Sequence, residues 1–305
     1  MNCSGSADLD RAIPGWEPPV EDPMKGQKGV GTHLHSILEQ IANRYLTTST
    51  SYMLRATWFD ITDVAYVFRE FAKVPKRKRI ELTQTLSDFC DWLDAETPMR
   101  GRYSLLDHLT LMVEEDMPPR HFVYISDCLE YIYRILHQLT LVHTREHISV
   151  YPELQLPAFW TGQEHARTTC DLVIVSPSEL HVLDYKAGTI PVYSEGNLQL
   201  LYYMTTVLNT VASPAAGRGN VVHILQRNNF SEYLIPPAEL NQFKLDALEA
   251  VKRIKSGDLT LTPGDHCTFC PANPQSRGDK GYPNCPAMAQ FLYPPIIDED
   301  EILEF

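Results

Sequence analysis

Hydrophobic and polar positions follow two different periods along this chain, and the period changes near residue 150. Before that point apolar residues recur at helical spacing, which predicts helices at 29–46, 61–73, 79–95 and 121–147. From Tyr151 onward apolar and polar residues alternate, which predicts strands at 151–159, 169–175, 180–186 and 221–227. Further helical patterns lie at 195–209 and 238–256. Together these elements predict an α/β fold.

The same patterns predict how the chain is organised. Residues 1–29 contain many Pro and Gly residues and are predicted to form an irregular arm. Residues 30–46 and 151–290 are predicted to form the core, interrupted by an all-helical insertion at 47–150 and followed by an acidic tail at 291–305. A chain of 305 residues with 44% hydrophobic content is long enough to bury such a core.

The segment 170–186 is typical of two strands joined by a tight turn. Its sequence is CDLVIVSPSELHVLDYK, and Pro177 stands at the second turn position, where its fixed φ fits. Pairing about this turn places Asp171 opposite Asp184 on the neighbouring strand. The two-residue period of a strand puts Lys186 on the same face as Asp184. One face of the hairpin is therefore predicted to carry two carboxylates and an ammonium group.

Two carboxylates that face each other across strands repel, so a positive charge is expected between them. A divalent cation, Mg²⁺ or Mn²⁺, held by Asp171, Asp184 and the carbonyl of Tyr185 would remove this repulsion. Such an ion polarises a phosphoryl oxygen and lowers the pKa of water, while Lys186 would orient the water or stabilise developing charge. From these residues alone, a hairpin with two solvated aspartates and a surface lysine remains the alternative.

Three further motifs occur in a fixed order around this hairpin. Gly31-Thr32-His33-Leu34-His35 lies on the first predicted helix, Asp184-Tyr185-Lys186-Ala187-Gly188 ends the hairpin, and Gln199-Leu200-Leu201-Tyr202-Tyr203 lies on the helix that follows. This order resembles the PD-(D/E)XK nucleases, in particular the RecB-like branch that includes CRISPR-associated exonucleases. In that branch the motifs read G-T-x-x-H, D-Y-K-x-G and Q-x-x-x-Y. The resemblance covers about residues 29–46 and 151–290.

The resemblance implies a restriction-endonuclease-like core, in which helices flank a mixed β-sheet. It implies a metal-dependent DNA nuclease, expected to be an exonuclease on single-stranded or end-containing DNA in phage or bacterial recombination and repair. It also implies that His35 is associated with the metal, that Gln199 and Tyr203 contact DNA near the scissile phosphate, and that Glu153 reaches the metal. A catalytically silent recombination factor or inhibitor with the same fold is the competing hypothesis, against which the intact Asp171, Asp184 and Lys186 set argues.

Four cysteines stand near the two ends of the chain, at Cys3, Cys267, Cys270 and Cys285. Their arrangement is similar to that of RecB-like nucleases whose four cysteines hold a [4Fe–4S] cluster. The gap between Cys270 and Cys285 is about twice the usual one, so a Zn²⁺ site on the same thiolates, or one including His266, stays open. Cys90, Cys128 and Cys170 lie in apolar periodic segments and are predicted to be buried core residues.

The formal net charge of −13 argues against sequence-blind attraction to DNA, so a DNA site must be locally basic. The densest basic run, a candidate DNA-binding segment unless it is only a solvated helix start, comprises Lys73, Lys76, Arg77, Lys78 and Arg79. The acidic tail ends in Phe305 and is similar to tails of single-stranded DNA-binding proteins, which suggests a replication or recombination partner or a gate over the DNA channel. A merely solubilising tail is the alternative.

The sequence contains no basic segment followed by an apolar one at its start, and no apolar stretch long enough to span a membrane. We therefore expect a cytoplasmic protein that does not bind membranes, located in the bacterial host cytoplasm if a phage encodes it.

Overall fold

The computed structural model describes residues 26–46, 60–75, 78–79, 81, 110, 112–114, 117–211, 217–257 and 260–262. Its α-helices are α2 (Gly26–Tyr45), α3 (Asp60–Lys73), α7 (Pro119–Thr140), α8 (Leu198–Thr210) and α9 (Pro237–Lys255). Its strands are β1 (Ser149–Pro157), β2 (Arg167–Val175), β3 (Glu179–Lys186), β4 (Gly219–Gln226) and β5 (Asn229–Leu234). Short 3₁₀ turns occupy Arg145–His147 and Phe159–Thr161.

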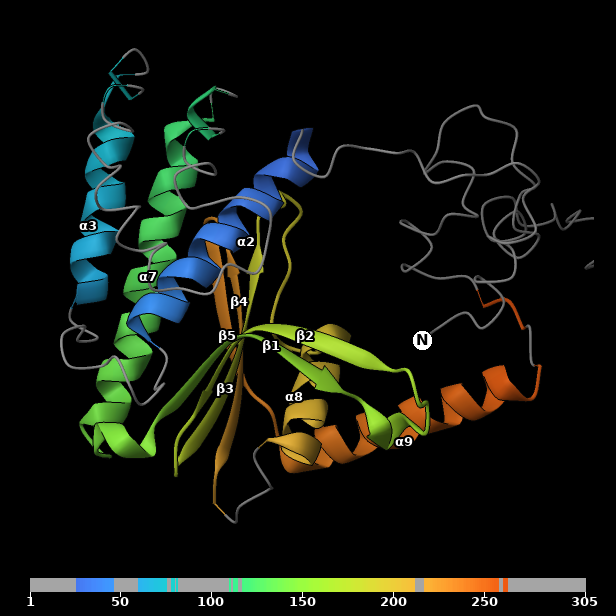
Figure 1. Ribbon diagram of the computed structural model, residues 1–305. Coiled ribbons are helices and arrows are strands. Elements are labelled where there is room, and N and C mark those ends of the chain that lie inside the picture. The colour runs from blue at the N-terminus through green and yellow to red at the C-terminus, as the bar shows by residue number, and fades with distance from the viewer. Residues whose placement is uncertain are drawn as a thin grey trace, which may run out of the picture. The chain divides into compact units, whose positions relative to one another are not determined.

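The five strands form one mixed sheet in the order β1-β2-β3-β4-β5. Strand β3 pairs antiparallel with β2 and parallel with β4, and α8 lies in the crossover between β3 and β4 (Figure 1). The register of the hairpin is the predicted one, since Val175 pairs with Leu180 and Leu172 pairs with Leu183. The α/β class, the mixed sheet and the flanking helices predicted from the sequence are therefore confirmed.

Helices pack on both faces of this sheet. On one face, α2, α3 and α7 share a hydrophobic core with sheet residues that include Leu172, Leu183, Tyr185 and Leu225. Helix α8 packs near β1, β2, β3 and β4 from the other face, where Asp184 and Lys186 point. The face of the hairpin that carries the predicted charged residues thus lies under α8.

Most element boundaries differ by one to three residues from the sequence prediction, and two differences are larger. Helix α7 ends at Thr140 rather than 147, and the apolar residues Leu141 and Val142 that extend its pattern are 74% and 72% exposed. Strand β5 was not predicted at all. Its sequence NFSEYL buries little of its surface, so the hydrophobic signal is weak, and its pairing with β4 is made by a tight turn in which Asn228 has φ 63°.

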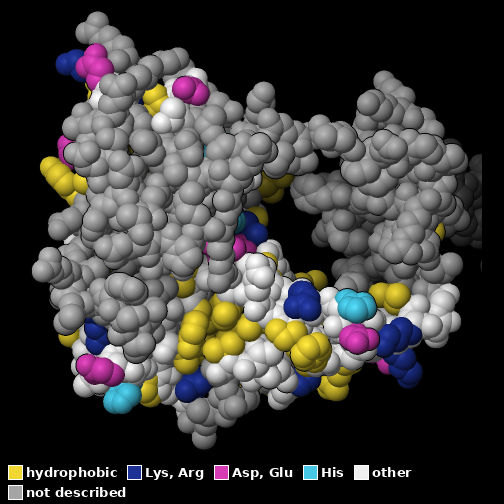
Figure 2. Space-filling model, viewed as in Figure 1, with side chains coloured by type: hydrophobic (Ala, Val, Ile, Leu, Met, Phe, Trp, Pro, Cys, Tyr) yellow, Lys and Arg dark blue, Asp and Glu magenta, His cyan; other side chains and the backbone are white. Residues whose placement is uncertain are grey.

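Strands β1 and β2 extend beyond the edge of β3 as a two-stranded ribbon. Their pairing continues from Leu154–Cys170 to Pro157–Arg167, whereas β2 and β3 pair only as far as Leu172 and Leu183. At the tip of this ribbon Trp160 donates a hydrogen bond to Thr206 of α8, and Phe159 beside it is 64% exposed. In the view of Figure 2, hydrophobic side chains gather over the β1–β2 ribbon.

Residues 21–241 form one compact unit, and α9 from Gln242 onward belongs to a second. None of the helices that the structure describes combines the length and apolar character needed to cross a membrane. Cys128 and Cys170 are buried free thiols, as predicted. Residues 26–29, predicted as the end of the irregular arm, form the start of α2, so this part of the prediction is wrong. The rest of the predicted arm, most of the helix at 79–95, Cys90, the four cysteines near the chain ends and the acidic tail lie outside the described residues.

Candidate active site

The candidate site forms where β2 separates from β3. The ladder between these strands ends at Leu172 and Leu183, although β3 stays paired with β4 as far as Lys186. The backbone N–H of Tyr185 would otherwise lose its partner, and the carboxylate of Asp171 accepts its hydrogen bond at 2.7 Å instead. Asp171 therefore fills the gap in the ladder and lies beside Asp184, as predicted from the hairpin.

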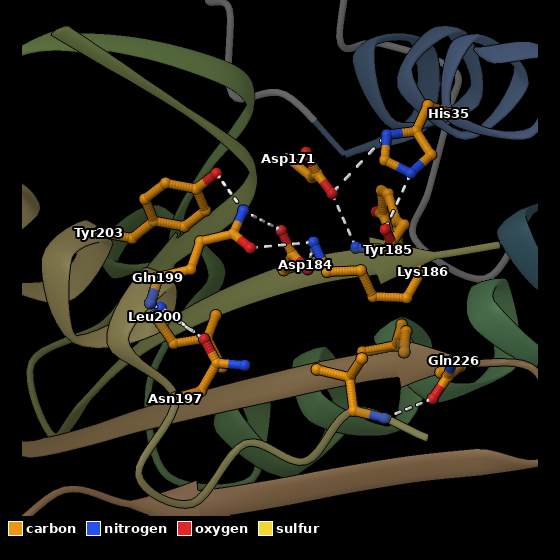
Figure 3. Close-up of polar contacts among 12 residues, drawn as sticks. His35, Asp171, Asp184, Tyr185, Lys186, Asn197, Gln199, Leu200, Tyr203 and Gln226 are labelled. Atoms are coloured by element: carbon orange, nitrogen blue, oxygen red, sulfur yellow. Dashed lines mark hydrogen bonds and ion pairs between the residues drawn. The ribbon is translucent and has the colours of Figure 1, made fainter. Parts of the chain in front are cut away.

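Helix α8 completes this site through Gln199. The side chain of Asn197 caps α8 by accepting hydrogen bonds from the N–H groups of Gln199 and Leu200, which fixes the first turn of the helix. From this turn Gln199 accepts a hydrogen bond from Lys186 Nζ at 3.0 Å and donates one to Asp184 Oδ1 at 3.0 Å (Figure 3). Its amide also donates to the hydroxyl of Tyr203. Lys186 Nζ lies 2.7 Å from Asp184 Oδ2.

Burial makes this charge arrangement costly for the carboxylates. Asp184 is almost fully buried, and this burial together with the charge of Asp171 raises its pKa to about 6, against the lowering effect of Lys186. Burial also raises the pKa of Asp171, while His35, the Tyr185 N–H and Lys186 act in the opposite direction. Two buried carboxylates with raised pKa values on one face are typical of a site that binds a cation.

The orientation of His35 points to the same conclusion. Its Nε2 lies 2.8 Å from the carbonyl oxygen of Tyr185, and because a carbonyl only accepts, Nε2 must carry the proton. Nδ1 faces Asp171 Oδ2 at 3.8 Å, and in the neutral tautomer with its proton on Nε2 it presents a lone pair to this carboxylate. Two atoms that both present lone pairs across such a gap suit a positive ion between them. The Tyr185 carbonyl, which the sequence suggested as a metal ligand, accepts the hydrogen bond of His35 here.

Glu153 joins this group through an irregular backbone. In the register of β1 and β2 it stands opposite Asp171, between the pairs Pro152–Leu172 and Leu154–Cys170, and it has a positive φ of 44°. Ligand atoms of His35, Glu153 and Asp171 all lie within 4.8 Å of one another. Two carboxylates and one imidazole nitrogen fit Mg²⁺ or, better, Mn²⁺.

Sequence reasoning missed the residue that holds the loop between Lys186 and α8. Gln226, the register partner of Lys186, is 2% exposed. Its amide nitrogen donates to the carbonyls of Gly188 and Ile190, and its oxygen accepts from the N–H of Val192. The loop that carries the chain from Lys186 to Gln199 is therefore tied to β4. A lone Gln at a strand end has no distinctive sequence pattern, so no signal pointed to it.

The predicted basic run does not form a continuous surface in the described residues. Lys73 is exposed and pairs with Glu70, and Lys78 is exposed. Arg79 is only 6% exposed, donates to the carbonyls of Val74 and Met117, and lies over the ring of Phe122. Its guanidinium therefore serves the packing of the helices and is not available to a phosphate at the surface. Lys76 and Arg77 lie outside the described residues.

Parts of this chain are similar to known proteins. A family model described as "Protein of unknown function (DUF2800)" matches residues 110–305, which include β1 to β5 and α8. The chain is also 29% identical over 119 residues to one of the subunits of the ATP-dependent helicase/deoxyribonuclease from three strains of Clostridium perfringens, ATCC 13124, 13 and SM101. The similarity covers 33% of this chain and only about a tenth of the length of those relatives.

Proposed function

The chain belongs to the DUF2800 family, and from this premise and its carboxylate site we propose that it is a metal-dependent deoxyribonuclease with a PD-(D/E)XK core of the restriction-endonuclease type. The observation that carries the proposal is the meeting of Asp171, Asp184 and Lys186 at the point where β2 leaves β3, beside His35 and Glu153. Similarity to part of a helicase/deoxyribonuclease supports the same class of activity.

Each residue of the site would have a different role in phosphodiester hydrolysis. His35, Glu153 and Asp171 would hold a Mg²⁺ or Mn²⁺ ion. Asp184 and the Tyr185 carbonyl are the further ligands that the sequence predicts. Such an ion would attract a phosphoryl oxygen and acidify water. Lys186, half-enclosed by Asp184 and Gln199, presents a fixed positive charge next to the reacting phosphate and stabilises the charge that develops there. Gln199, on α8, holds Asp184 and Lys186 in position through its side-chain amide and contacts the hydroxyl of Tyr203.

A cleavage assay tests this proposal directly. Purified protein with Mg²⁺ or Mn²⁺ is expected to shorten DNA labelled at either the 5′ or the 3′ end, and the comparison of single and double strands shows which it prefers. Asp184→Ala and Lys186→Ala should each lower the rate on the order of a hundredfold or more, because each removes a group that acts on the transition state. Lys252→Ala on the exposed face of α9 is the matched control and should cleave as the wild type does.

Two results would contradict the proposal. Full activity in both Asp184→Ala and Lys186→Ala at matched metal concentration would place the chemistry elsewhere. Tight DNA binding by the wild type with no cleavage under any of the metal conditions would favour the silent DNA-binding factor. Circular dichroism spectra of all variants separate a lost function from a lost fold.

We also propose that Cys3, Cys267, Cys270 and Cys285 bind a [4Fe–4S] cluster, with Zn²⁺ as the second candidate for the same thiolates. Protein purified without oxygen is expected to be brown, and Cys→Ser at any of the four positions should bleach it. Colourless protein with stoichiometric zinc would decide for the zinc site. Protein without either metal would rule out both.

A further inference from the structure

Two arginines lie at the N-terminal end of α7. Arg120 lies in the first turn of the helix, and Arg227 follows directly after β4. Arg120 directly precedes His121, and Arg227 Nη1 lies 3.5 Å from His121 Nε2. Within the part of the chain that the structure describes, neither forms an ion pair with Asp or Glu, whereas Arg69 binds Asp127 and Glu130.

His121 orients Arg227 without neutralising it. Its Nε2 lies 3.5 Å from Arg227 Nη1, and because a guanidinium only donates, the imidazole is the acceptor. Burial, followed by the charges of Arg227 and Arg120, lowers the pKa of His121 to about 4. The imidazole is therefore neutral near pH 7, and both arginines keep their full charge. In a protein with a net charge of −13, such a pair stands out from its surroundings.

The helix end adds to this positive field. The first turn of α7 contains no acidic residue, and Pro118 at its N-cap makes no side-chain capping hydrogen bond. Within the first turn and the N-cap of α7, no side chain therefore neutralises the positive end of the helix dipole. Anions bind readily at such an end when cationic side chains stand beside it.

The arginine pair lies at the same end of the sheet as the candidate active site. Gln226, immediately before Arg227, is the register partner of Lys186 on the neighbouring strand. The hydroxyl of Tyr124 donates to the carbonyl of Leu225 at 2.6 Å, which fixes the start of α7 over the end of β4. Lys186 lies on the face of the sheet that α8 covers, and the two arginines lie on the face that α7 covers. A DNA strand that crosses this end of the sheet can therefore contact both.

We propose that Arg120 and Arg227 bind backbone phosphodiesters of the DNA strand whose scissile phosphate lies at Asp184 and Lys186. The inference rests on the proposed nuclease function and deepens it, because it assigns the substrate contact that the buried Arg79 cannot make. Two planar guanidinium groups suit paired phosphate oxygens and carry no sequence preference. The arginine pair therefore binds DNA of any sequence.

The test measures binding separately from cleavage. A fluorescently labelled single-stranded oligonucleotide is titrated with full-length protein carrying Asp184→Ala, and fluorescence anisotropy gives the affinity at several salt concentrations. The double variant Arg120→Gln/Arg227→Gln should bind more weakly at low salt. The slope of log affinity against log salt should fall in magnitude by about 1.4, because two phosphate contacts are lost on a single strand. Arg120→Lys/Arg227→Lys should recover most of the slope.

Arg134→Gln is the matched control. Arg134 is an exposed arginine on the same helix, stacked over the ring of Tyr131, and at 1.5 Å per residue it lies about 21 Å from Arg120. Its loss changes the net charge by the same amount per residue but should leave the salt slope as it was. Melting curves of all variants confirm that the fold is intact.

The outcomes separate this inference from the proposed function. If the parent protein does not bind DNA at low salt, both fail. If it binds and the double glutamine variant binds equally well with the same slope, the arginine pair is not a DNA contact and only this inference fails. If inorganic phosphate at constant ionic strength displaces DNA from the parent at millimolar concentration but not from the double variant, phosphate and DNA compete for the arginine pair, which supports the inference.

Discussion

Replacing Asp184 by Asn should stabilise the metal-free protein, although it removes a proposed catalytic group. Burial and the charge of Asp171 raise the pKa of Asp184 from 3.8 to about 6, so the folded state holds the ionised carboxylate at a cost. A shift of about two units corresponds to about 3 kcal/mol. Asn keeps the size and the hydrogen-bonding oxygen that Gln199 contacts, and it removes the charge that opposes Asp171.

The pH dependence follows from the direction of the shift. A carboxyl group whose pKa is raised on folding carries no penalty below its unfolded pKa of about 3.8, and stability is lost as the pH rises through about 6. The advantage of Asp184→Asn should therefore be absent near pH 4, grow between pH 4 and 6, and stay constant above about pH 7. For a chain of 305 residues, about 3 kcal/mol corresponds to a rise in melting temperature of about 5 °C.

Thermal melts in a chelator at several pH values measure this effect, with Glu164→Gln as the control. Glu164 is an exposed carboxylate in the loop between β1 and β2, so its loss should change the melting temperature little at any pH. Adding Mn²⁺ should narrow the difference to near zero, because the ion stabilises the wild type by about 2.7 kcal/mol at a hundred times its dissociation constant and binds the variant less well. A metal-free variant that melts with or below the wild type at pH 8 would refute the reasoning about buried charge.

Three further outcomes follow from the same geometry. Glu153→Gln should weaken Mn²⁺ binding about tenfold or more in calorimetry, since it removes one of the three grouped ligands, and an unchanged affinity would exclude Glu153 from the site. Gln199→Ala should lower the cleavage rate about tenfold or more while Mn²⁺ affinity stays near that of the wild type, because Gln199 positions Asp184 and Lys186 but is not one of the grouped metal ligands. An equal loss of Mn²⁺ affinity would contradict this positioning role. Burial lowers the pKa values of His181 and His223, although Glu179 and Glu232 lie nearby, so the stability that their neutral forms give above about pH 6.5 is lost as the pH falls. His223→Phe should therefore make the melting temperature depend less on pH between about 6.5 and 5. An unchanged dependence of melting temperature on pH would show that the buried histidines do not cause it.

The sequence predicted the parts of the site whose position depends on local periodicity. The turn at Ser176–Glu179 and the alternation of the two strands determine the hairpin register, so the pairing next to Asp171 and Asp184 followed from short-range rules. The helix that carries Gln199 was predicted for a similar reason, because its apolar residues recur every three to four positions.

Features that depend on the meeting of distant segments were not predictable in this way. The buried position of Arg79 arises because its guanidinium reaches the carbonyl of Met117, 38 positions further along the chain, and a basic run looks the same in sequence whether or not its members pack. The stacked pair His181 and His223 exists only because β3 and β4 run parallel side by side. Arg120 and Arg227 lie 107 positions apart in the chain, and only the packing of α7 on the end of β4 brings them together.

The backbone at Glu153 has a consequence for how this protein responds to selection. A left-handed conformation in a residue other than Gly, Asn or Asp costs on the order of 1 kcal/mol, and in this strand it interrupts regular pairing as well. Gly or Asn adopts that backbone conformation more easily than glutamate does. A laboratory population selected only for heat resistance should therefore lose Glu153 early, while one that must also keep the bound ion should retain it and acquire its stabilising substitutions elsewhere.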